Sequence, residues 1–221
     1  MFVSNPPAPQ RKTLVLLSGG LDSATVLALA RLNTCSKVFT LSFDYGQTHT
    51  KELDSARRLS EHYNTCHLVV QMLSLHMLSG PTDASAVEYQ DDVGLLPETW
   101  KPGRNIMFLT FAGAYAWEHD IHVIALGVHQ EDYPGYPDCR LEFLTHMEQT
   151  LRQGLAHPVE LWTPLLHMNK TQIVELGLKS KVPYELTWSC YKGGEKPCGK
   201  CDACIRRASA FKANKTKDPA L

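Results

Sequence analysis

The sequence of 221 residues contains no apolar run that approaches the roughly twenty residues of a membrane-spanning helix. The stretch MFVSNPPAPQRKT, residues 1–13, also lacks a long apolar segment, so we expect no signal peptide. Basic residues are not in excess, because the formal net charge is −1, and no global positive field attracts a nucleic-acid backbone. These absences predict a cytoplasmic protein with no membrane association and no stable nucleic-acid partner.

A disulfide framework is not expected either. The seven cysteines are an odd number, and they occur without a secretion signal. Hydrophobic residues make up 43% of the chain and charged residues 20%, which is an ordinary globular composition. The length fits one α/β domain, and no internal repeat or clear linker interrupts it. We therefore expect residues 1–221 to form a single domain.

Apolar segments with strand and helix periods alternate along the chain. The irregular stretch Met72–Arg104 interrupts them, and we interpret it as a long connection that is either a lid or disordered. The alternation predicts an α/β protein with a doubly wound parallel sheet and right-handed crossovers. We expect strands at Thr13–Leu17, Lys37–Gly46, Cys66–Gln71, His122–Val128 and Val159–Leu165, and helices at Asp22–Leu32, Thr48–Tyr63, Asn105–His119, Glu142–Leu155 and Asn169–Lys179.

The short loop SGGLDS, Ser18–Ser23, follows the first expected strand and leads into the first expected helix. Ligands of open parallel sheets bind at the carboxyl ends of the strands. The two glycines let backbone N–H groups converge, the helix N-terminus adds partial positive charge, and the serines add hydroxyl donors. This combination suits a phosphate group, although a plain strand-to-helix turn is the alternative. Asp22 would then face Mg²⁺ or cap helix amides.

The loop matches neither the Walker A motif nor the GxGxxG dinucleotide fingerprint. Its SGGxDS string resembles the PP-loop of the ATP pyrophosphatase superfamily, which has a Rossmann-like fold. Enzymes of that superfamily cleave ATP between its α- and β-phosphates and attach AMP to an oxygen of the substrate. The resemblance implies that the bound anion is the ATP triphosphate tail, which is released as pyrophosphate.

A second motif lies near the C-terminal end, where four cysteines follow the spacing C-x7-C-x2-C-x2-C. Four thiolates in so short a segment suit tetrahedral Zn²⁺, and an iron–sulfur cluster also accepts four thiolates. Since the protein fills all four positions, we interpret the zinc as structural, within a segment at residues 187–211. The proposed ligands are Cys190, Cys198, Cys201 and Cys204.

Taken together, the motifs resemble the 7-cyano-7-deazaguanine synthase (QueC) family of queuosine precursor biosynthesis, from Thr13 to Phe211. Beyond the PP-loop, the resemblance covers FDYGQTH at Phe43–His49, PGRN at Pro102–Asn105 and GYPDCR at Gly135–Arg140. It continues through NKT at Asn169–Thr171 and the cysteine segment TWSCYKGGEKPCGKCDACIRRASAF.

The resemblance implies an ATP-dependent ligase that converts 7-carboxy-7-deazaguanine and ammonia to the nitrile through an adenylated intermediate, with release of AMP and pyrophosphate. Lys170 and Arg104 would meet the polyphosphate, although a solvated lysine at a helix start is the alternative for Lys170. ATP with Mg²⁺ would contact Ser18, Gly19, Gly20, Asp22 and Ser23. The family also suggests a homodimer.

The segment GVHQEDYPGYPDCR follows the fourth expected strand and is the candidate base pocket. A carboxylate accepts well from the N–H edge of a guanine-like base, and an aromatic ring stacks on its face. An arginine pairs with the substrate carboxylate or a phosphate. The candidates are Asp132, Asp138, Tyr133, Tyr136 and Arg140, with Phe43 from the second strand, and a turn-rich loop is the alternative. The family usually has Cys or Asn where His129 stands and Ser where Pro134 stands.

Two other functions remain open at this point. A QueC-like paralogue would join the adenylated acid to another amine, such as a protein or peptide N-terminus. A tRNA-modifying PP-loop enzyme would need an RNA-binding domain or a basic stripe. The only dense basic stretch is RRASAFKANKTK at residues 206–217, which is short and terminal.

Overall fold

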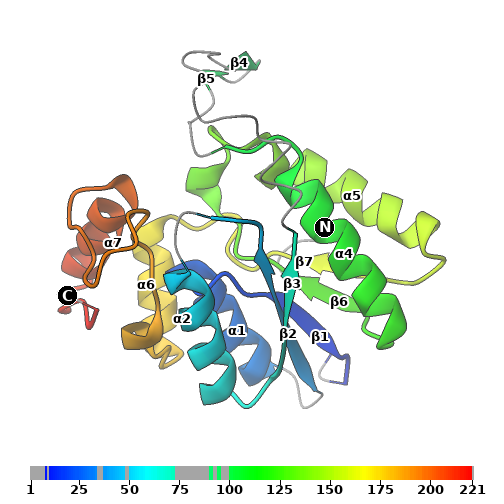
Figure 1. Ribbon diagram of the computed structural model, residues 1–221, viewed down its shortest axis with the longest axis horizontal. Coiled ribbons are helices and arrows are strands. Elements are labelled where there is room, and N and C mark those ends of the chain that lie inside the picture. Colours follow the sequence, from blue (N-terminus) through cyan, green and yellow to red (C-terminus); the bar gives the residue numbers. More distant parts are fainter. Residues whose placement is uncertain are drawn as a thin grey trace.

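The computed structural model describes residues 8, 10–33, 37–47, 50–72, 90–91, 94–95 and 100–220. Its main sheet has five strands, all parallel, in the order β3-β2-β1-β6-β7 (Figure 1). Thr13 of the central strand lies opposite Val38 on one side and Val123 on the other. The strands are β1 (Thr13–Leu16), β2 (Val38–Asp44), β3 (Cys66–Gln71), β6 (Val123–Ala125) and β7 (Glu160–Trp162).

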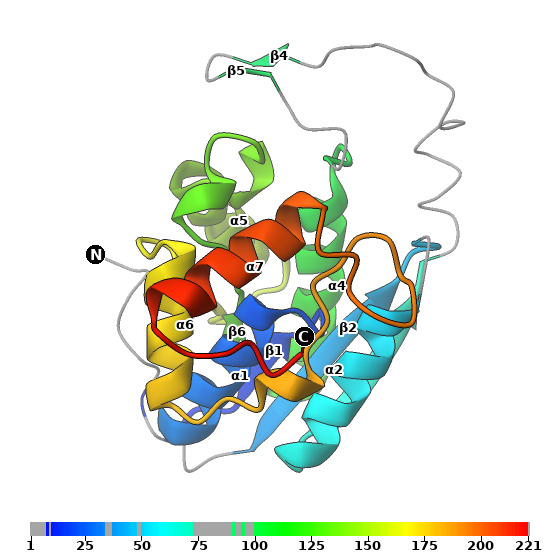
Figure 2. The ribbon, with the colours of Figure 1, turned by 90° about the vertical axis from the view of Figure 1, so that its left-hand side faces the viewer.

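Helices cover both faces of this sheet, as Figure 1 shows. Apolar side chains of α1, α2, α6 and α7 form the core on one face, and those of α4 and α5 form the core on the other. Figure 2 shows α7 lying beside α6 on the outside of the first layer. The helices are α1 (Leu21–Asn33), α2 (Lys51–His62), α4 (Arg104–Glu118), α5 (Leu141–Gly154), α6 (Lys170–Lys179) and α7 (Asp202–Ala213).

Strand side chains alternate between the two cores. Val15 and Val123 face the α1 side, whereas Leu14 and Ile124 face the α4 side, and all four are fully buried. Both faces of each central strand are therefore apolar, as expected of a parallel sheet covered on both sides. Burying one such side chain contributes about 1.5–3 kcal/mol.

The fold class predicted from the sequence is confirmed, and the strands and helices fall within a few residues of the expected ranges. The helix α7 was not expected. A two-residue pair, β4 (Gln90–Asp91) with β5 (Gly94–Leu95), forms a separate antiparallel sheet. Most of the expected connection at 72–104 lies outside the described residues, as do positions 48 and 49 of the FDYGQTH motif.

The strand order places a switch point between β1 and β6. The chain leaves β1 toward β2 and β3 and then returns through α4 to β6 on the other side of β1. At such a point the loops after the two strands diverge and open a crevice at the carboxyl edge. None of the helices in the described ranges is both long and apolar enough to cross a membrane.

Candidate active site and metal centre

The loop between β1 and α1 lies directly against the first turns of α2. Gly19 has a φ of +87°, a conformation that favours glycine. A Cβ at this position would collide with the main-chain oxygen of Glu52 and lie 2.8 Å from the main-chain nitrogen of Ala56. Helix α2 therefore packs tightly against the loop, and any residue larger than glycine at position 19 would displace either the loop or the helix.

Two serine hydroxyls meet within this loop. Ser18 Oγ lies 3.0 Å from Ser23 Oγ, and Ser23 Oγ donates to the carbonyl oxygen of Gly20 at 3.2 Å. Because α1 begins at Leu21, its free N-terminal amides and partial positive charge face the same space. The loop thus presents hydroxyl and amide donors to an anion.

Lys170 and Asp22 meet beside the loop, although they are 148 positions apart in the sequence. Lys170 is the first residue of α6, and its Nζ lies 2.7 Å and 2.8 Å from the two carboxylate oxygens of Asp22. The same Nζ lies 2.9 Å from Nε2 of His129, which is buried. Among the described residues, Asp22 makes no capping bond to a helix amide. Its carboxylate faces a lysine instead.

Within the loop after β6, the Asp132 side chain contacts the start of the same loop at His129. Asp132 Oδ2 accepts the backbone N–H of His129 at 3.0 Å, and Asp132 Oδ1 lies 3.4 Å from His129 Nε2. Burial raises the pKa of Asp132, and the neighbouring His129 opposes that shift. Asp132 therefore stabilises the loop that also carries the other residues proposed for the base pocket.

Asp138 differs, because one of its carboxylate oxygens has no hydrogen-bond partner among the residues that the structure describes. Its Oδ2 accepts the backbone N–H of Asn105 at 3.1 Å, in the first turn of α4. Its Oδ1 is buried and makes no hydrogen bond to any residue that the structure describes. The residue is only 6% exposed. A buried acceptor without a donor costs about 1–3 kcal/mol, which a bound N–H group would recover.

The predicted aromatic residues divide into two groups. Phe43 is buried at the end of β2 and stacks on Phe108, with ring centroids 4.1 Å apart. Tyr133 is 42% exposed, and the Arg140 guanidinium lies 5.5 Å from its ring centroid. Arg140 Nε also donates to the Tyr133 carbonyl oxygen at 3.0 Å. Phe43 thus packs in the core, whereas Tyr133 and Arg140 form a pair at the surface.

Glu131 is an organising residue that sequence reasoning missed. Its Oε1 accepts the backbone N–H of Lys170 at 2.7 Å, and its Oε2 pairs with Nη1 of Arg206 at 2.8 Å. Burial pushes its pKa upward, but the two hydrogen bonds together with the charges of His129 and Arg206 outweigh burial, and the pKa is lowered. Glu131 joins the β6 loop to α6 and α7, and its partners lie too far along the chain for any local signal.

The four clustered cysteines converge as their spacing predicts. Their sulfur atoms all lie within 4.8 Å of one another, and the Sγ atoms of Cys198 and Cys204 are 4.0 Å apart. With Zn–S bonds of about 2.3 Å, tetrahedral coordination needs sulfur–sulfur distances of about 3.8 Å. The donor set and its spacing therefore fit a four-coordinate metal ion.

Backbone amides point at the sulfurs of this cluster. Cys198 Sγ accepts from the N–H groups of Lys200 at 3.5 Å and Cys201 at 3.3 Å, and these bonds lower the pKa of Cys198 to about 6. Burial raises the pKa of Cys204 to about 12. A bound cation would favour both thiolates, and the amide donors already orient one of them.

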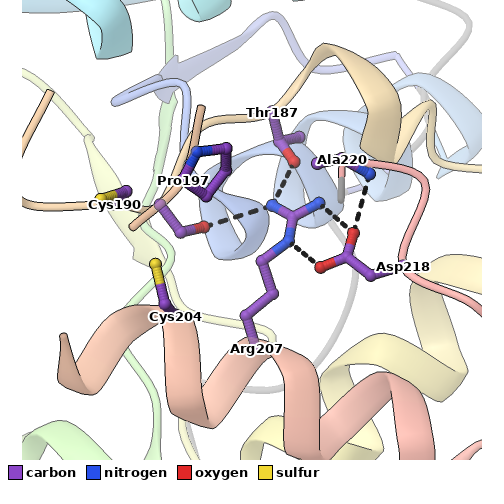
Figure 3. Close-up of a pocket in the computed structure, with 8 residues that line it drawn as sticks. Thr187, Cys190, Pro197, Cys204, Arg207, Asp218 and Ala220 are labelled. Carbon is purple, nitrogen blue, oxygen red and sulfur yellow. Dashed lines mark hydrogen bonds and ion pairs between the residues drawn. The ribbon is translucent and has the colours of Figure 1, made fainter. Parts of the chain in front are cut away.

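A buried arginine lies beside the cysteine cluster, as Figure 3 shows. Arg207 of α7 pairs with Asp218 through two contacts, Nε to Oδ2 at 2.7 Å and Nη2 to Oδ1 at 2.9 Å. Its Nη1 also donates to Thr187 Oγ1 at 2.6 Å. The guanidinium thus joins the C-terminal tail to the segment that leads into Cys190.

Comparison with known proteins identifies the same family that the motifs resemble. The family model described as queuosine biosynthesis protein QueC matches residues 12–215. A protein named 7-cyano-7-deazaguanine synthase from Prochlorococcus marinus (strain MIT 9312) is 41% identical over 211 residues, covering 91% of this chain and 94% of the relative. One of the same name from Thermoplasma volcanium is 43% identical over 217 residues, covering 95% and 90%.

Solved structures with low sequence identity share the fold. The NMN synthetase of Francisella tularensis has a TM-score of 0.54 at 17% identity, and the match covers 96% of this chain and 79% of that one. The U34-tRNA thiolase NcsA of Methanococcus maripaludis, with its [4Fe-4S] cluster, has a TM-score of 0.52 at 15% identity, covering 93% and 66%. These likenesses show that the fold is shared and nothing more specific.

Proposed function

The chain belongs to the QueC family, and from this membership we propose that it is an ATP-dependent 7-cyano-7-deazaguanine synthase. Relatives of that name match over nearly the whole chain, and both motifs that carry the resemblance form compact sites in the structure. The substrates would be 7-carboxy-7-deazaguanine, ammonia and ATP. The comparisons do not favour a paralogue with another amine acceptor or a tRNA-modifying enzyme.

ATP would be used as an adenylating reagent, in the manner of a carbon–nitrogen ligase that releases AMP and pyrophosphate. The SGGLDS loop offers two hydroxyl groups and the N-terminal amides of α1 to the departing pyrophosphate. Lys170 would exchange Asp22 for a phosphate oxygen, and Asp22 would then be free to approach the Mg²⁺ that accompanies ATP. Attack on the α-phosphate by a carboxylate needs mainly positioning and charge neutralisation, which Lys170 and Arg104 would supply.

The base would bind between the loops that follow β2 and β6. The observation that carries this proposal is the buried Oδ1 of Asp138, which makes no hydrogen bond within the described part of the chain. The N–H edge of a 7-deazaguanine would satisfy it. Tyr136 would stack on the ring, while Tyr133, Asp132 and Arg140 shape the outer loop. Phe43 supports the pocket from the core.

A Zn²⁺ ion held by the cysteine cluster would be structural, because the protein supplies all four ligands and leaves no position for substrate. We also propose that residues 1–221 act as one domain, with the metal segment at 187–211 as part of it. A homodimer in the cytoplasm is our proposal for the assembly. Helix α4 exposes Ile106, Phe111 and Trp117, which is apolar surface that a second copy would cover.

Mass spectrometry of the products tests the proposed function. Purified protein incubated with 7-carboxy-7-deazaguanine, ATP and ammonium should yield the nitrile, with AMP formed in parallel. A control without ammonium should stop before any carbon–nitrogen bond forms. A modified peptide in place of the free nitrile would favour the paralogue, and no reaction of the acid under any condition would contradict the proposal.

A further inference from the structure

Glu52 lies beside the loop proposed to bind phosphate, and its carboxylate makes no hydrogen bond or ion pair to any described residue. It belongs to the first turn of α2, and its main-chain oxygen packs against Gly19. The carboxylate is partly buried. Side chains of a helix tilt toward its N-terminus, and the N-terminus of α2 lies at the carboxyl edge of the sheet. Glu52 therefore projects toward the edge that binds ligands.

Two further polar groups approach Glu52 from different elements. Arg104 begins α4 and Tyr45 follows β2, and both interact electrostatically with the Glu52 carboxylate. Burial raises the pKa of Glu52 to about 7, and the charge of Arg104 only partly offsets that rise. Burial also raises the pKa of Tyr45, and the neighbouring Arg104 opposes that rise. No other charged or titratable group acts on Glu52 among the described residues.

A structural role does not account for this arrangement. An acidic residue in the first turn of a helix normally gains from the positive end of the dipole. Here burial disfavours the ionised form of Glu52 by more than the charge of Arg104 favours it. A glutamate is an effective general base when its pKa lies near the working pH, because its carboxylate then accepts and releases a proton readily. A raised pKa beside the proposed phosphate loop favours a role in chemistry over a role in packing.

We propose that Glu52 is the general base that takes a proton from the attacking nitrogen, an inference that rests on the proposed function. Glu52 in its carboxylate form accepts a proton from ammonium as the nitrogen lone pair forms a bond to the acyl carbon. The bond from that carbon to the AMP oxygen breaks, and AMP leaves with the electron pair. The products are the amide, AMP, the protonated Glu52 and one proton released from the new amide nitrogen.

The test compares nucleophiles and half-reactions in Glu52→Gln. This variant preserves the size and shape of the side chain but cannot accept the proton. Exchange of labelled pyrophosphate into ATP, in the presence of 7-carboxy-7-deazaguanine, reports adenylation without an amine. Ammonium and hydroxylamine then serve as alternative nucleophiles, because hydroxylamine is largely unprotonated at neutral pH. Glu61→Gln makes the same chemical change on the exposed end of α2 and is the control.

At pH 7, ammonium-dependent AMP formation should fall at least about 100-fold in Glu52→Gln, which is the lower range for general base catalysis. Pyrophosphate exchange and hydroxylamine-dependent turnover should stay within about 3-fold of the wild type. The deficit with ammonium should shrink as pH rises and free ammonia replaces ammonium. Glu61→Gln should match the wild type throughout.

Two outcomes would overturn the proposal. In the first, Glu52→Gln retains its ammonium-dependent rate. In the second, pyrophosphate exchange and turnover with both nucleophiles fall by the same factor. That result would mean that Glu52 shapes the site or binds a substrate and does not accept a proton. Absence of pyrophosphate exchange in the wild type would instead contradict the proposed function, so the two failures are distinguishable.

Discussion

Trp188 donates its backbone N–H to the carbonyl oxygen of Gly19 at 2.9 Å. Its indole Nε1 also donates to the carbonyl oxygen of Cys190 at 2.8 Å. One residue thus joins the segment that carries the cysteine cluster to the loop proposed to hold pyrophosphate. Order in the metal segment is therefore linked to the shape of the phosphate loop through Trp188.

The metal prediction follows from that link. Purified protein should carry one Zn²⁺ per chain, and Cys201→Ser should lower the melting temperature by about 10 °C, since each kcal/mol shifts it by about 2–4 °C at this size. Metal analysis and calorimetry measure both effects. Turnover at temperatures well below melting should be affected less. Cys66→Ser, outside the cluster, is the control, and a metal-free protein with unchanged melting and activity would contradict the assignment.

Ser23→Ala tests the phosphate loop. Ser23 is buried and its hydroxyl contacts both Ser18 and Gly20, so its loss removes one donor from the loop. Turnover should fall by about 10-fold or more, as expected for a hydrogen bond to a charged group worth about 1.5–3 kcal/mol. The melting temperature should change little. Phosphorus NMR should show AMP and pyrophosphate in the wild type, and ADP with phosphate would mean that the loop was misinterpreted. Thr145→Ala, on the exposed face of α5, is the matched control.

The features that could be predicted from the sequence are local ones. Periodicity located the strands and most helices, and the spacing of four cysteines within fifteen positions predicted their convergence. Helix α7 was missed, because basic residues and cysteine ligands interrupt its apolar period. Long-range pairs such as Lys170 with Asp22, or Glu131 with Arg206, depend on how α6 and α7 dock, which no local pattern encodes. The pKa shift of Glu52 likewise arises from burial against distant segments.

Asp138→Asn tests the base pocket more sharply than alanine would. The asparagine oxygen can still accept from the Asn105 amide, so α4 keeps its contact. An NH₂ donor would then replace the acceptor at Oδ1. Calorimetric titration should show binding of 7-carboxy-7-deazaguanine weakened by about 10- to 100-fold, and ATP binding nearly unchanged. Tyr136→Leu should weaken binding of 7-carboxy-7-deazaguanine less than Asp138→Asn does, since only stacking is lost. Normal binding by Asp138→Asn would place the pocket elsewhere.

Asp218→Asn tests the buried pair beside the metal segment. Arg207 and Asp218 have side-chain exposures of 7% and 4%, so removing one charge leaves the other buried and uncompensated. Unfolding in urea should show a loss of about 3–5 kcal/mol. Glu175→Gln breaks the exposed Lys179–Glu175 pair and should cost less than about 1 kcal/mol. Equal, small losses in both variants would show that the buried pair adds nothing.

Glu52→Gln should stabilise the protein, and the gain should depend on pH. The pKa of Glu52 lies at about 7 in the folded protein, against an ordinary value of 4.5, so the folded state holds a proton that the unfolded state has lost between these values. Raising the pH through this window therefore favours unfolding. The destabilisation is absent below about pH 4.5 and complete above about pH 7, where it reaches at most about 3 kcal/mol.

The measurement is the difference in unfolding free energy between Glu52→Gln and the wild type, in urea, at several pH values. Metal loss at low pH affects both proteins equally and cancels in the difference. The gain of the variant should grow from near zero at about pH 4 to about 3 kcal/mol at pH 8. Glu61→Gln should show no such trend. A gain that is constant with pH would mean that Glu52 ionises normally, and a residue with an ordinary pKa would be a poor proton acceptor for ammonium at neutral pH.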